Sequence, residues 1–367
     1  MRSKAAAALV IGGFLIASCG GGPQAPPSVR PLWRAPVTAG GDPPSTTPAI
    51  DASHLFVVAS TVQAYAPGTG RLLWATPLHA YVPRSLLTVS GLVIVPEAVV
   101  SALDAATGRS VWEFAPDANT SLGRATTDGE SIYIGTASHR VYALRVATGQ
   151  ARWTTDLGPD WTYPAVVRGL AVDKGTLFAA VEQWLDADGR ASAGWLVALE
   201  ASTGRVLWRS LGTEGERRGG LSSAPAVTDR LVIGSDVPGN ALVAFDRRSG
   251  QPLWRYLGEA GRPGFPEAPI VLGNSIYVGS GDTYAYSLTL DGQLRWRTKL
   301  RASIGSYAWC GSVVLFNDQS LTVVDPISGR VLERELDDTE FPTSGVSVRN
   351  GDAFLLGPKA VYAYHCT

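Results

Sequence analysis

Hydrophobic and polar positions alternate along this chain in short runs that are separated by turn-forming residues. Runs such as residues 131–135 (SIYIG) and 141–144 (VYAL) combine β-branched and aromatic side chains. Gly, Asp and Ser bound these runs, and this pattern is typical of short β-strands. The sequence therefore predicts an all-β chain of short strands joined by tight turns.

A motif of eleven residues, A-x-D-x-x-T-G-x-x-x-W, ends each group of strands. The copy at residues 102–112 (ALDAATGRSVW) matches it fully, and weaker copies lie at 286–296 and 323–333, where Glu333 replaces the tryptophan. Close copies occupy residues 64–74, 143–153, 198–208 and 244–254. Successive copies lie 37 to 55 residues apart, and a regular repeat of about 40–45 residues is typical of a propeller blade.

Each repeat unit is expected to hold four antiparallel strands. A proline-containing strand opens the unit, as in residues 46–50 (TTPAI), and two apolar runs follow it. The Thr-Gly or Ser-Gly pair of the motif makes the last turn, because glycine readily adopts the positive φ of a tight turn. The segment that ends in tryptophan is then the fourth strand.

The two ends of the chain complete one further blade. Residues 31–37 (PLWRAPV) resemble a fourth strand with Trp33 in the motif position, whereas residues 361–364 (VYAY) resemble a third strand. Pairing them gives an eight-bladed β-propeller in which the N-terminal strand joins the C-terminal blade. Such closure leaves no open edge between the first and last blades.

The first residues resemble a lipoprotein export signal. Arg2 and Lys4 precede an apolar stretch at residues 5–16, and Ile-Ala-Ser-Cys follows. We expect residues 1–18 to be a signal peptide, Cys19 to be lipidated and residues 19–30 to be a flexible tether. Residues 31–367 then form one propeller domain. A plain signal peptide with an incidental cysteine is the alternative.

The expected location is outside the cytoplasm, with the N-terminal lipid as the membrane attachment. In an organism with two membranes, the protein would sit on the outer membrane and face the periplasm; otherwise it would sit on the outer face of the cell membrane. The mature chain would carry a net charge of about −3 and contains no Lys/Arg run. Nucleic acid is therefore not an expected partner.

Catalytic chemistry is not visible in the sequence. The four histidines are scattered, and no nucleophile elbow, phosphate-binding loop or metal-ligand spacing occurs. Residues 186–189 (DADG) match a hairpin turn better than a calcium loop. We assign no catalytic, cofactor-binding or metal-binding residue and expect no enzyme.

The motif resembles the tryptophan-docking repeat of the PQQ-like propeller superfamily. This resemblance implies that each Trp ring lies between the small first residue of its motif and the glycine peptide of a neighbouring blade. The residues concerned are Trp33, Trp74, Trp112, Trp153, Trp208, Trp254 and Trp296.

Two branches of the superfamily are relevant. Quinoprotein dehydrogenases hold PQQ and calcium on the propeller axis, and many have a disulfide between adjacent cysteines, which this chain lacks. The chain is more similar to the BamB family of outer-membrane protein assembly lipoproteins, in blade number, length and N-terminal cysteine.

This similarity favours a non-catalytic, monomeric binding scaffold whose partner is a protein, such as the β-barrel assembly machinery. The alternatives are a binding or sensing lipoprotein for another envelope or secreted partner and, less favoured, a PQQ-dependent dehydrogenase.

Cys310 and Cys366 are candidates for a disulfide. Exported proteins favour oxidation of paired cysteines. Cys310 is expected at a turn of blade seven, and Cys366 directly after the third strand of the neighbouring blade eight. Two separate thiols are the alternative.

A partner-binding face is expected over blades four to six. The links at residues 208–225 and 254–269 are longer than the link at 153–164, and the hairpin at 183–194 is enlarged. In a four-stranded meander these segments open on the same face. The candidate contact residues are Trp184, Leu185, Arg190, Arg217, Arg218, Arg262 and Phe265, because Arg and aromatic residues are enriched at interfaces. Freely varying loops, with Trp184 packed under its own hairpin, are the alternative.

Overall fold

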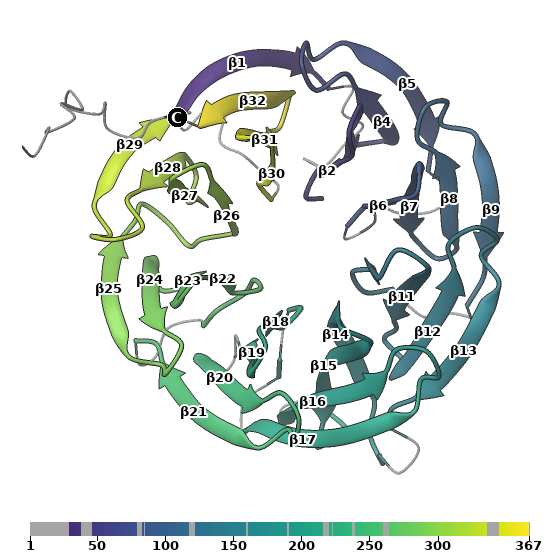
Figure 1. Cartoon of the computed structure of the whole chain (residues 1–367), viewed down its shortest axis with the longest axis vertical. Helices are drawn as coiled ribbons and strands as arrows, with labels where there is room; N and C mark the ends of the chain where they lie inside the picture. Colours follow the sequence, from purple (N-terminus) through teal and green to yellow (C-terminus); the bar gives the residue numbers. More distant parts are fainter. Residues whose placement is uncertain are drawn as a thin grey trace, which may run out of the picture.

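A computed structural model describes residues 29–37, 46–78, 83, 85–116, 122–158, 161–188, 191–215, 220–221, 223–236, 239–259, 264–335 and 345–366. These segments form eight four-stranded antiparallel sheets, which pack side by side as blades around a central axis (Figure 1). Over these ranges, no helix has the length and hydropathy needed to cross a membrane. The predicted all-β, eight-bladed fold is confirmed.

Blades one to four follow one another along the chain, and each contributes four consecutive strands. Blade one has β2 (Ala49–Ile50), β3 (Leu55–Val58), β4 (Thr61–Tyr65) and β5 (Leu72–Pro77). Blade two has β6 (Leu87–Val89), β7 (Leu92–Pro96), β8 (Val100–Asp104) and β9 (Ser110–Phe114). Blade three has β10 (Thr126–Thr127), β11 (Ser131–Gly135), β12 (Arg140–Arg145) and β13 (Ala151–Asp156). Blade four has β14 (Ala165–Asp173), β15 (Thr176–Trp184), β16 (Ser192–Glu200) and β17 (Val206–Gly215).

Blades five to seven repeat this arrangement, and blade eight combines the two ends of the chain. Blade five has β18 (Ala226–Val227), β19 (Leu231–Asp236), β20 (Ala241–Asp246) and β21 (Pro252–Leu257). Blade six has β22 (Ile270–Leu272), β23 (Ser275–Gly279), β24 (Tyr284–Thr289) and β25 (Leu294–Lys299). Blade seven has β26 (Ser306–Cys310), β27 (Val313–Asn317), β28 (Leu321–Val324) and β29 (Val331–Glu335). Blade eight has β30 (Ser347–Arg349), β31 (Asp352–Leu356), β32 (Ala360–Cys366) and β1 (Val29–Pro36).

The ring closes where β1 pairs with β32. The two strands are antiparallel, and Trp33 lies opposite Ala363. This pairing matches the predicted closure, although β1 already begins at Val29, two residues before the predicted start of the propeller. The C-terminal blade thus obtains its outermost strand from the N-terminal part of the chain (Figure 1).

Each motif tryptophan lies opposite a small residue of the third strand in the same blade. Trp112, for example, pairs with Ala102, and a β-bulge follows directly. Blade six differs from the motif alignment, because Trp296 pairs with Ser287 and not with Tyr286. The turn of blade six is one residue shorter than the others, so the alignment by fixed spacing was wrong at this position.

The indole ring of one blade packs against a glycine of the next blade. A Cβ atom built on that glycine would lie only 2.4 to 2.7 Å from an indole carbon, so any side chain there would collide with the ring. Six indole N–H groups donate to backbone carbonyls of the same neighbouring turn at 2.7 to 3.0 Å. The docking pairs are Trp33–Gly70, Trp74–Gly108, Trp112–Gly149, Trp153–Gly204, Trp208–Gly250, Trp254–Gly292 and Trp296–Gly329.

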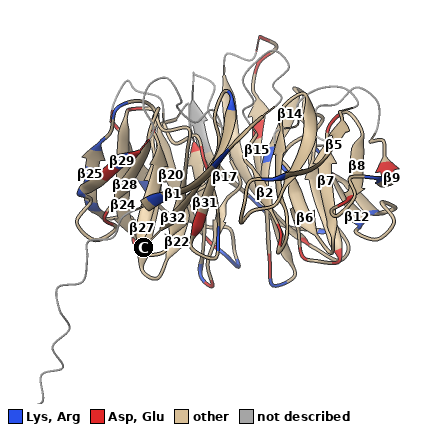
Figure 2. Ribbon diagram, turned by 90° about the horizontal axis from the view of Figure 1, so that it is seen from above, with Lys and Arg blue, Asp and Glu red and all other residues tan. Residues whose placement is uncertain are grey.

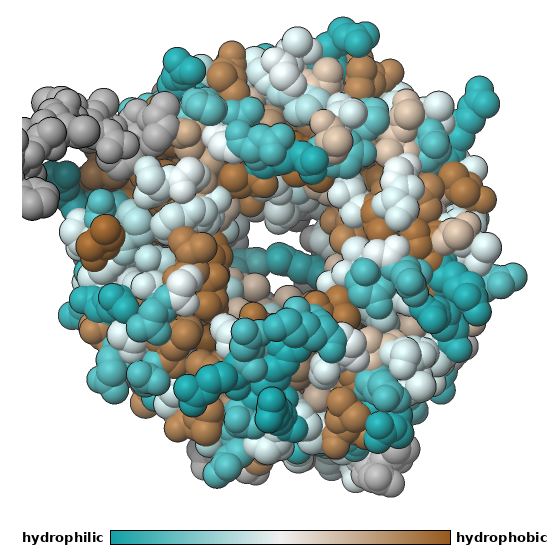
Figure 3. Space-filling model, in the orientation of Figure 1, coloured by the Kyte–Doolittle hydropathy of each residue, from teal (hydrophilic) through white to brown (hydrophobic). Residues whose placement is uncertain are grey.

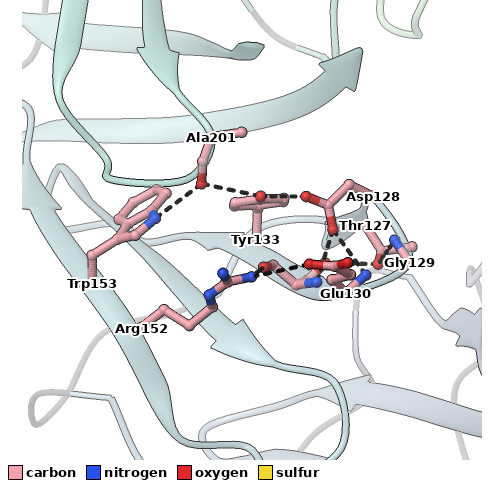
Figure 4. A network of polar contacts seen from close by, with 9 residues as sticks. Thr127, Asp128, Gly129, Glu130, Tyr133, Arg152, Trp153 and Ala201 are labelled. Atoms are coloured by element: carbon pink, nitrogen blue, oxygen red, sulfur yellow. Dashed lines mark hydrogen bonds and ion pairs between the residues drawn. The ribbon is translucent and has the colours of Figure 1, made fainter. Parts of the chain in front are cut away.

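Polar contacts reinforce the joint between blades three and four (Figure 4). Trp153 Nε1 donates to the Ala201 carbonyl at 3.0 Å, and Thr155 Oγ1 donates to the Gly204 carbonyl at 2.7 Å. The Tyr133 hydroxyl donates to Asp128 Oδ2 of its own blade at 2.6 Å and lies 3.2 Å from the Ala201 carbonyl of blade four. Burial, together with this hydrogen bond, raises the pKa of Tyr133 to about 12, so Tyr133 remains a donor at neutral pH.

The joint between blades seven and eight lacks a docked tryptophan. Blade eight has no continuous turn between its third and fourth strands, because β32 ends at Cys366 and β1 begins at Val29. The Val29 N–H donates instead to Glu333 Oε2 at 3.1 Å, and Glu333 occupies the motif position of tryptophan. Glu333, which replaces tryptophan in this copy of the motif, therefore binds the first residue of β1, the strand that closes the ring.

A disulfide joins the same two blades. The Cα atoms of Cys310 and Cys366 lie 5.9 Å apart, and their sulfur atoms are bonded, a separation within the usual range for disulfides. The Cys366 N–H also donates to the Gly351 carbonyl at 2.8 Å. The disulfide therefore links blades seven and eight at the joint where tryptophan docking is missing.

We expect that Gly204→Ala will destabilise the fold more than Gly175→Ala. Both glycines lie in blade four with φ of +74°, so alanine is strained at either position, but only Gly204 contacts Trp153. Overpacking of this kind costs about 1–3 kcal/mol. Chemical denaturation of the two variants measures the difference. Equal losses would show that the Trp–Gly contact contributes nothing beyond backbone conformation.

We also expect no free thiol from Cys310 and Cys366 in the denatured, unreduced protein. Their bond closes a loop with a sequence separation of 56 residues, for which chain-entropy arguments give up to ~4 kcal/mol of stabilisation. Cys366→Ser should therefore lower the melting temperature of the oxidised protein. Under reducing conditions the wild type also lacks the bond, so the variant and the wild type should then have nearly the same melting temperature. Two titratable thiols would contradict the bond.

Candidate functional site

Blade four is taller than its neighbours. Its strands have nine or ten residues, whereas no strand of blades three and five exceeds six. Seen from the side, the ring is a flat disc, and the end of β15 rises above the adjacent blades (Figure 2). The extension brings the hairpin between β15 and β16 to the upper face.

Aromatic side chains lie on both faces of this extension, because Trp195 pairs with Val181 and Trp184 with Ser192, which places their side chains on opposite faces of the sheet. The rings of Trp161 and Trp195 lie 6.1 Å apart, and Trp195 Nε1 donates to Gln183 Oε1 at 2.8 Å. The Arg209 guanidinium lies 6.0 Å from the Trp161 ring. The half-buried Trp184 and the exposed Leu185 lie at the end of β15. We call Trp161, Trp184, Leu185 and Trp195 the blade-four rim.

A buried ion pair supports the rim. Glu182, which directly precedes Gln183, is buried, and its carboxylate accepts hydrogen bonds from both Nε and Nη2 of Arg168. A Cβ on Gly220 would collide with the Glu182 side chain, so the link from blade four to blade five packs closely on it. The rim is thus held in place by β14 and by this link.

Only part of the predicted partner face can be placed. Trp184 is half-buried, and Leu185 is 36% exposed on the hairpin. Arg190, Arg217, Arg218 and Arg262 lie outside the described residues, so their contact role stays a prediction. Cys19 lies outside them as well.

Phe265 is not a surface residue, and its predicted contact role was wrong. It is fully buried, and its ring packs edge-on against Tyr286 with 5.6 Å between centroids. Leu122 and Leu221, which also precede the first strand of a blade, are buried in the same way. The last part of a link therefore fills the core between blades, and the length of the link did not reveal this.

Trp161 and Trp195 were missed as candidate contact residues. Three of the four tryptophans outside the repeat motif, Trp161, Trp184 and Trp195, belong to blade four or the link that enters it. This concentration was visible in the sequence and could have identified the rim.

An ion pair crosses the central channel. Arg124 lies just before β10 of blade three, and Glu267 lies just before β22 of blade six. Two blades separate blades three and six on one side of the ring and four on the other, so the pair spans the central opening off its centre line (Figure 1). The guanidinium donates to both carboxylate oxygens, at 2.7 and 2.8 Å, and hydrophilic atoms reach across the central opening in Figure 3.

The backbone of Glu267 is fixed by the blades on either side. Ser235 Oγ of blade five and the Tyr307 hydroxyl of blade seven each donate to its carbonyl at 3.1 Å. Burial raises the pKa of Tyr307 well above its usual value, so this hydroxyl keeps its proton. The acidic end of the ion pair is thus rigidly supported.

The channel does not fit an axial cofactor of the quinoprotein type. PQQ and calcium on the propeller axis would need the space that the Arg124–Glu267 pair crosses. Nowhere in the described segments do three or more His, Cys, Asp or Glu side chains form a group that could hold a metal ion. The Arg124–Glu267 ion pair thus occupies the part of the channel in which an axial cofactor would have to lie.

These features define the class of protein. The chain is an eight-bladed propeller whose blades are joined by docked tryptophans and whose ring is closed by its two ends. It belongs to the family described as outer membrane protein assembly factor BamB, whose profile matches residues 25–180 and 192–355.

Solved structures of a BamB protein and of a dehydrogenase share this fold. BamB from Moraxella catarrhalis superposes with a TM-score of 0.73 at 15% identity, over 92% of this chain and 100% of that one. Quinohemoprotein alcohol dehydrogenase from Comamonas testosteroni gives a TM-score of 0.70 at 15% identity, over 92% and 76% of the two chains. Identities this low establish the fold alone.

One curated relative is an enzyme. The quinohemoprotein alcohol dehydrogenase ADH IIB of Pseudomonas putida is 31% identical over 127 residues, which is 30% of this chain and 17% of that protein. The match thus spans about a sixth of the relative's length.

We expect that PQQ with calcium will not raise the melting temperature of the protein. A ligand present at a hundred times its Kd would stabilise the fold by about 2.7 kcal/mol, which thermal denaturation detects easily. Arg124→Ala removes the ion pair across the channel and serves as the comparison. Saturable PQQ binding by the wild-type protein would contradict an axis closed by Arg124 and Glu267.

Proposed function

We propose that this protein is a non-catalytic, lipid-anchored binding scaffold that acts as an accessory factor in outer-membrane β-barrel protein assembly. The observation that carries the proposal is the blade-four rim, in which Leu185 and the half-buried Trp184 lie at the hairpin, and Trp161 and Trp195 pack partly against the core between blades three and four. Membership of the BamB family supports the assembly role.

The composition of the rim suits protein recognition. Tryptophan and arginine are enriched among residues that dominate binding energy, and such residues cluster where rigid side chains can be desolvated. The Trp195 hydrogen bond to Gln183 and the contact with Trp161 fix the rings in advance. A fixed surface loses little conformational entropy when a partner binds.

A PQQ-dependent dehydrogenase is the second candidate function. The sequence match to an alcohol dehydrogenase favours it. The match is short, however, and the Arg124–Glu267 pair crosses the axis on which that chemistry would depend. The scaffold function therefore agrees better with the channel.

The proposed anchor is a lipid on Cys19, followed by a tether that ends before Val29, where β1 begins. It would hold the ring close to a membrane, outside the cytoplasm. Metabolic labelling with a radioactive fatty acid tests this part by itself, since Cys19→Ser should abolish the label.

The partner is identified by a photo-crosslinking amino acid placed at position 185 in the native cell envelope. Crosslinks to components of the barrel-assembly machinery would support the assembly role. Crosslinks only to a different envelope or secreted protein would contradict that role and would favour the alternative of a binding or sensing lipoprotein.

We expect that Leu185→Asp will weaken capture of the crosslinked partner by about tenfold, equivalent to ~1.4 kcal/mol. The substitution places a charge on the exposed hairpin without disturbing the core. Ile327→Asp is the matched control, because Ile327 is 88% exposed in a turn between a third and a fourth strand, on the opposite face. If both variants lose partner capture equally, the partner does not contact the hairpin at Leu185.

A further inference from the structure

A pocket of about 460 Å³ lies where blade five meets blade six. Its apolar walls come from Leu231, Leu253 and Trp254 of blade five and from Leu290, in the turn between β24 and β25 of blade six. Pockets that bind small molecules have volumes of about 300–1,000 Å³ and mostly apolar walls. The size and the lining of this pocket therefore suit a small organic molecule.

In most blades an aromatic ring of the second strand lies beside the motif tryptophan. The two residues and the small residue between them form a row across the sheet, which in blade three consists of Tyr133, Ala143 and Trp153. In blades one, three, four, six and eight, the centroids of the two rings lie 5.8 to 6.1 Å apart. Blade five has Ile233 in this row, so no ring of β19 lies beside Trp254.

The joint between blades three and four shows which group fills the equivalent space (Figure 4). The Tyr133 hydroxyl lies 2.6 Å from Asp128 Oδ2 and 3.2 Å from the Ala201 carbonyl. Strand register and the tryptophan N–H acceptors align these two positions with Thr228 and Leu290. Thr228 and Leu290 both line the pocket. A phenol ring thus occupies, in blade three, the space that is open beside Trp254.

Blade two also has an isoleucine in this row, Ile94, but its joint is closed in another way. The turn that it meets, in blade three, has the full length, and Val146 of that turn packs in one core cluster with Ile94 and Trp112. The turn of blade six is one residue shorter, and its Leu290 is half-buried. The missing ring and the short turn coincide at the joint of blades five and six, where the pocket lies.

The outer wall of the pocket is apolar where the joint between blades three and four is polar. In blade three, Arg152 directly precedes the motif tryptophan, and its Nη1 donates to Ser131 Oγ at 2.6 Å. The corresponding residues of blade five are Leu253 and Leu231. Leu253 is 48% exposed, so a ligand in the pocket would remove apolar surface from water.

Exposed charged residues of both signs border the pocket. They are Asp229, Arg230 and Asp291, and Asp229 forms an ion pair with Lys174 of blade four. Charges of both signs give no preference for an anion or a cation. They do complement a hydroxyl group, because a hydroxyl donates one hydrogen bond and accepts two, whereas a carboxylate accepts and a guanidinium donates.

We propose that this pocket binds an uncharged, planar aromatic molecule with one or two fused rings and a hydroxyl group. The ligand ring lies beside Trp254 as Tyr133 lies beside Trp153, and its hydroxyl contacts the charged border. Aromatic rings attract one another at such separations. The ligand is a free small molecule, because the volume of the pocket is that of a small-molecule site.

The pocket is a second site, and it goes beyond the proposed assembly role. Its turns join first to second and third to fourth strands, so it lies at the end of the blades opposite to the hairpin between β15 and β16. Its test leaves every residue of the blade-four rim unchanged. Failure of one proposal therefore does not affect the other.

The experiment measures binding of a fluorinated naphthol to the purified protein by fluorine NMR. Ile233→Tyr supplies from the chain itself the ring that blade three has in this row. We expect this variant to bind the naphthol at least tenfold more weakly than the wild type, and to melt at a higher temperature because the pocket is filled. Melting curves also show that each variant is folded.

A second variant changes only the exposed wall. Leu253→Arg places at this position the arginine that blade three has, and it should weaken binding at least fivefold. Val111→Arg is the matched control, because Val111 is 52% exposed and directly precedes Trp112 in blade two. The control should bind within twofold of the wild type. Equal binding by the wild type and all three variants would overturn the proposal, as would the absence of saturable binding.

Two competitors test the class of ligand. The saturated alcohol decahydronaphthol should displace the naphthol at least fivefold less effectively, because it has no planar ring. The capped peptide Gly-Tyr-Gly should also be the weaker competitor. Equal displacement by the saturated alcohol would overturn the aromatic assignment. Tighter binding of the peptide would overturn the assignment to a free small molecule and would favour a tyrosine side chain of a partner protein.

Discussion

The structure depends on one repeated contact, the indole ring of one blade against a glycine in the next. The ring fits only because the glycine has no side chain, and its N–H finds a backbone carbonyl in the same turn. Each contact joins the outer strand of one blade to the turn of its neighbour. A repeat protein whose units touch only their neighbours relies on such interfaces for its stability.

The single exception to this contact explains several unusual residues at once. Blade eight lacks a continuous turn, because it is assembled from the two ends of the chain. A tryptophan in blade seven would have no glycine to dock on, and Glu333 stands there and binds the Val29 N–H. The disulfide between Cys310 and Cys366 links the same pair of blades. The ring is therefore continuous, although one of its joints is built differently.

A frame held in this way leaves its surfaces free to differ. Blade four extends into a tall hairpin that carries several tryptophans, and the channel is crossed by Arg124 and Glu267. The same fold occurs in an assembly factor and in alcohol dehydrogenases. Function must therefore be argued from these local features.

The sequence predicted the architecture because the motif states the interblade contact directly: alanine, glycine and tryptophan at fixed spacing. The alignment by fixed spacing was wrong in blade six, where a shorter turn places Ser287, and not Tyr286, opposite Trp296. Phe265 looked like a surface anchor, but the ends of links fold into the core.

The most direct test of this account is the thermal stability of Trp33→Ala. Trp33 lies opposite Ala363 and against Gly70, so it takes part both in ring closure and in docking. Truncation of a fully buried tryptophan typically costs about 3–5 kcal/mol, which is an upper limit for the partly buried Trp33. We predict that Trp33→Ala lowers the melting temperature as much as Trp153→Ala does at an internal joint. An unchanged melting curve for Trp33→Ala would mean that β1 does not hold the ring closed.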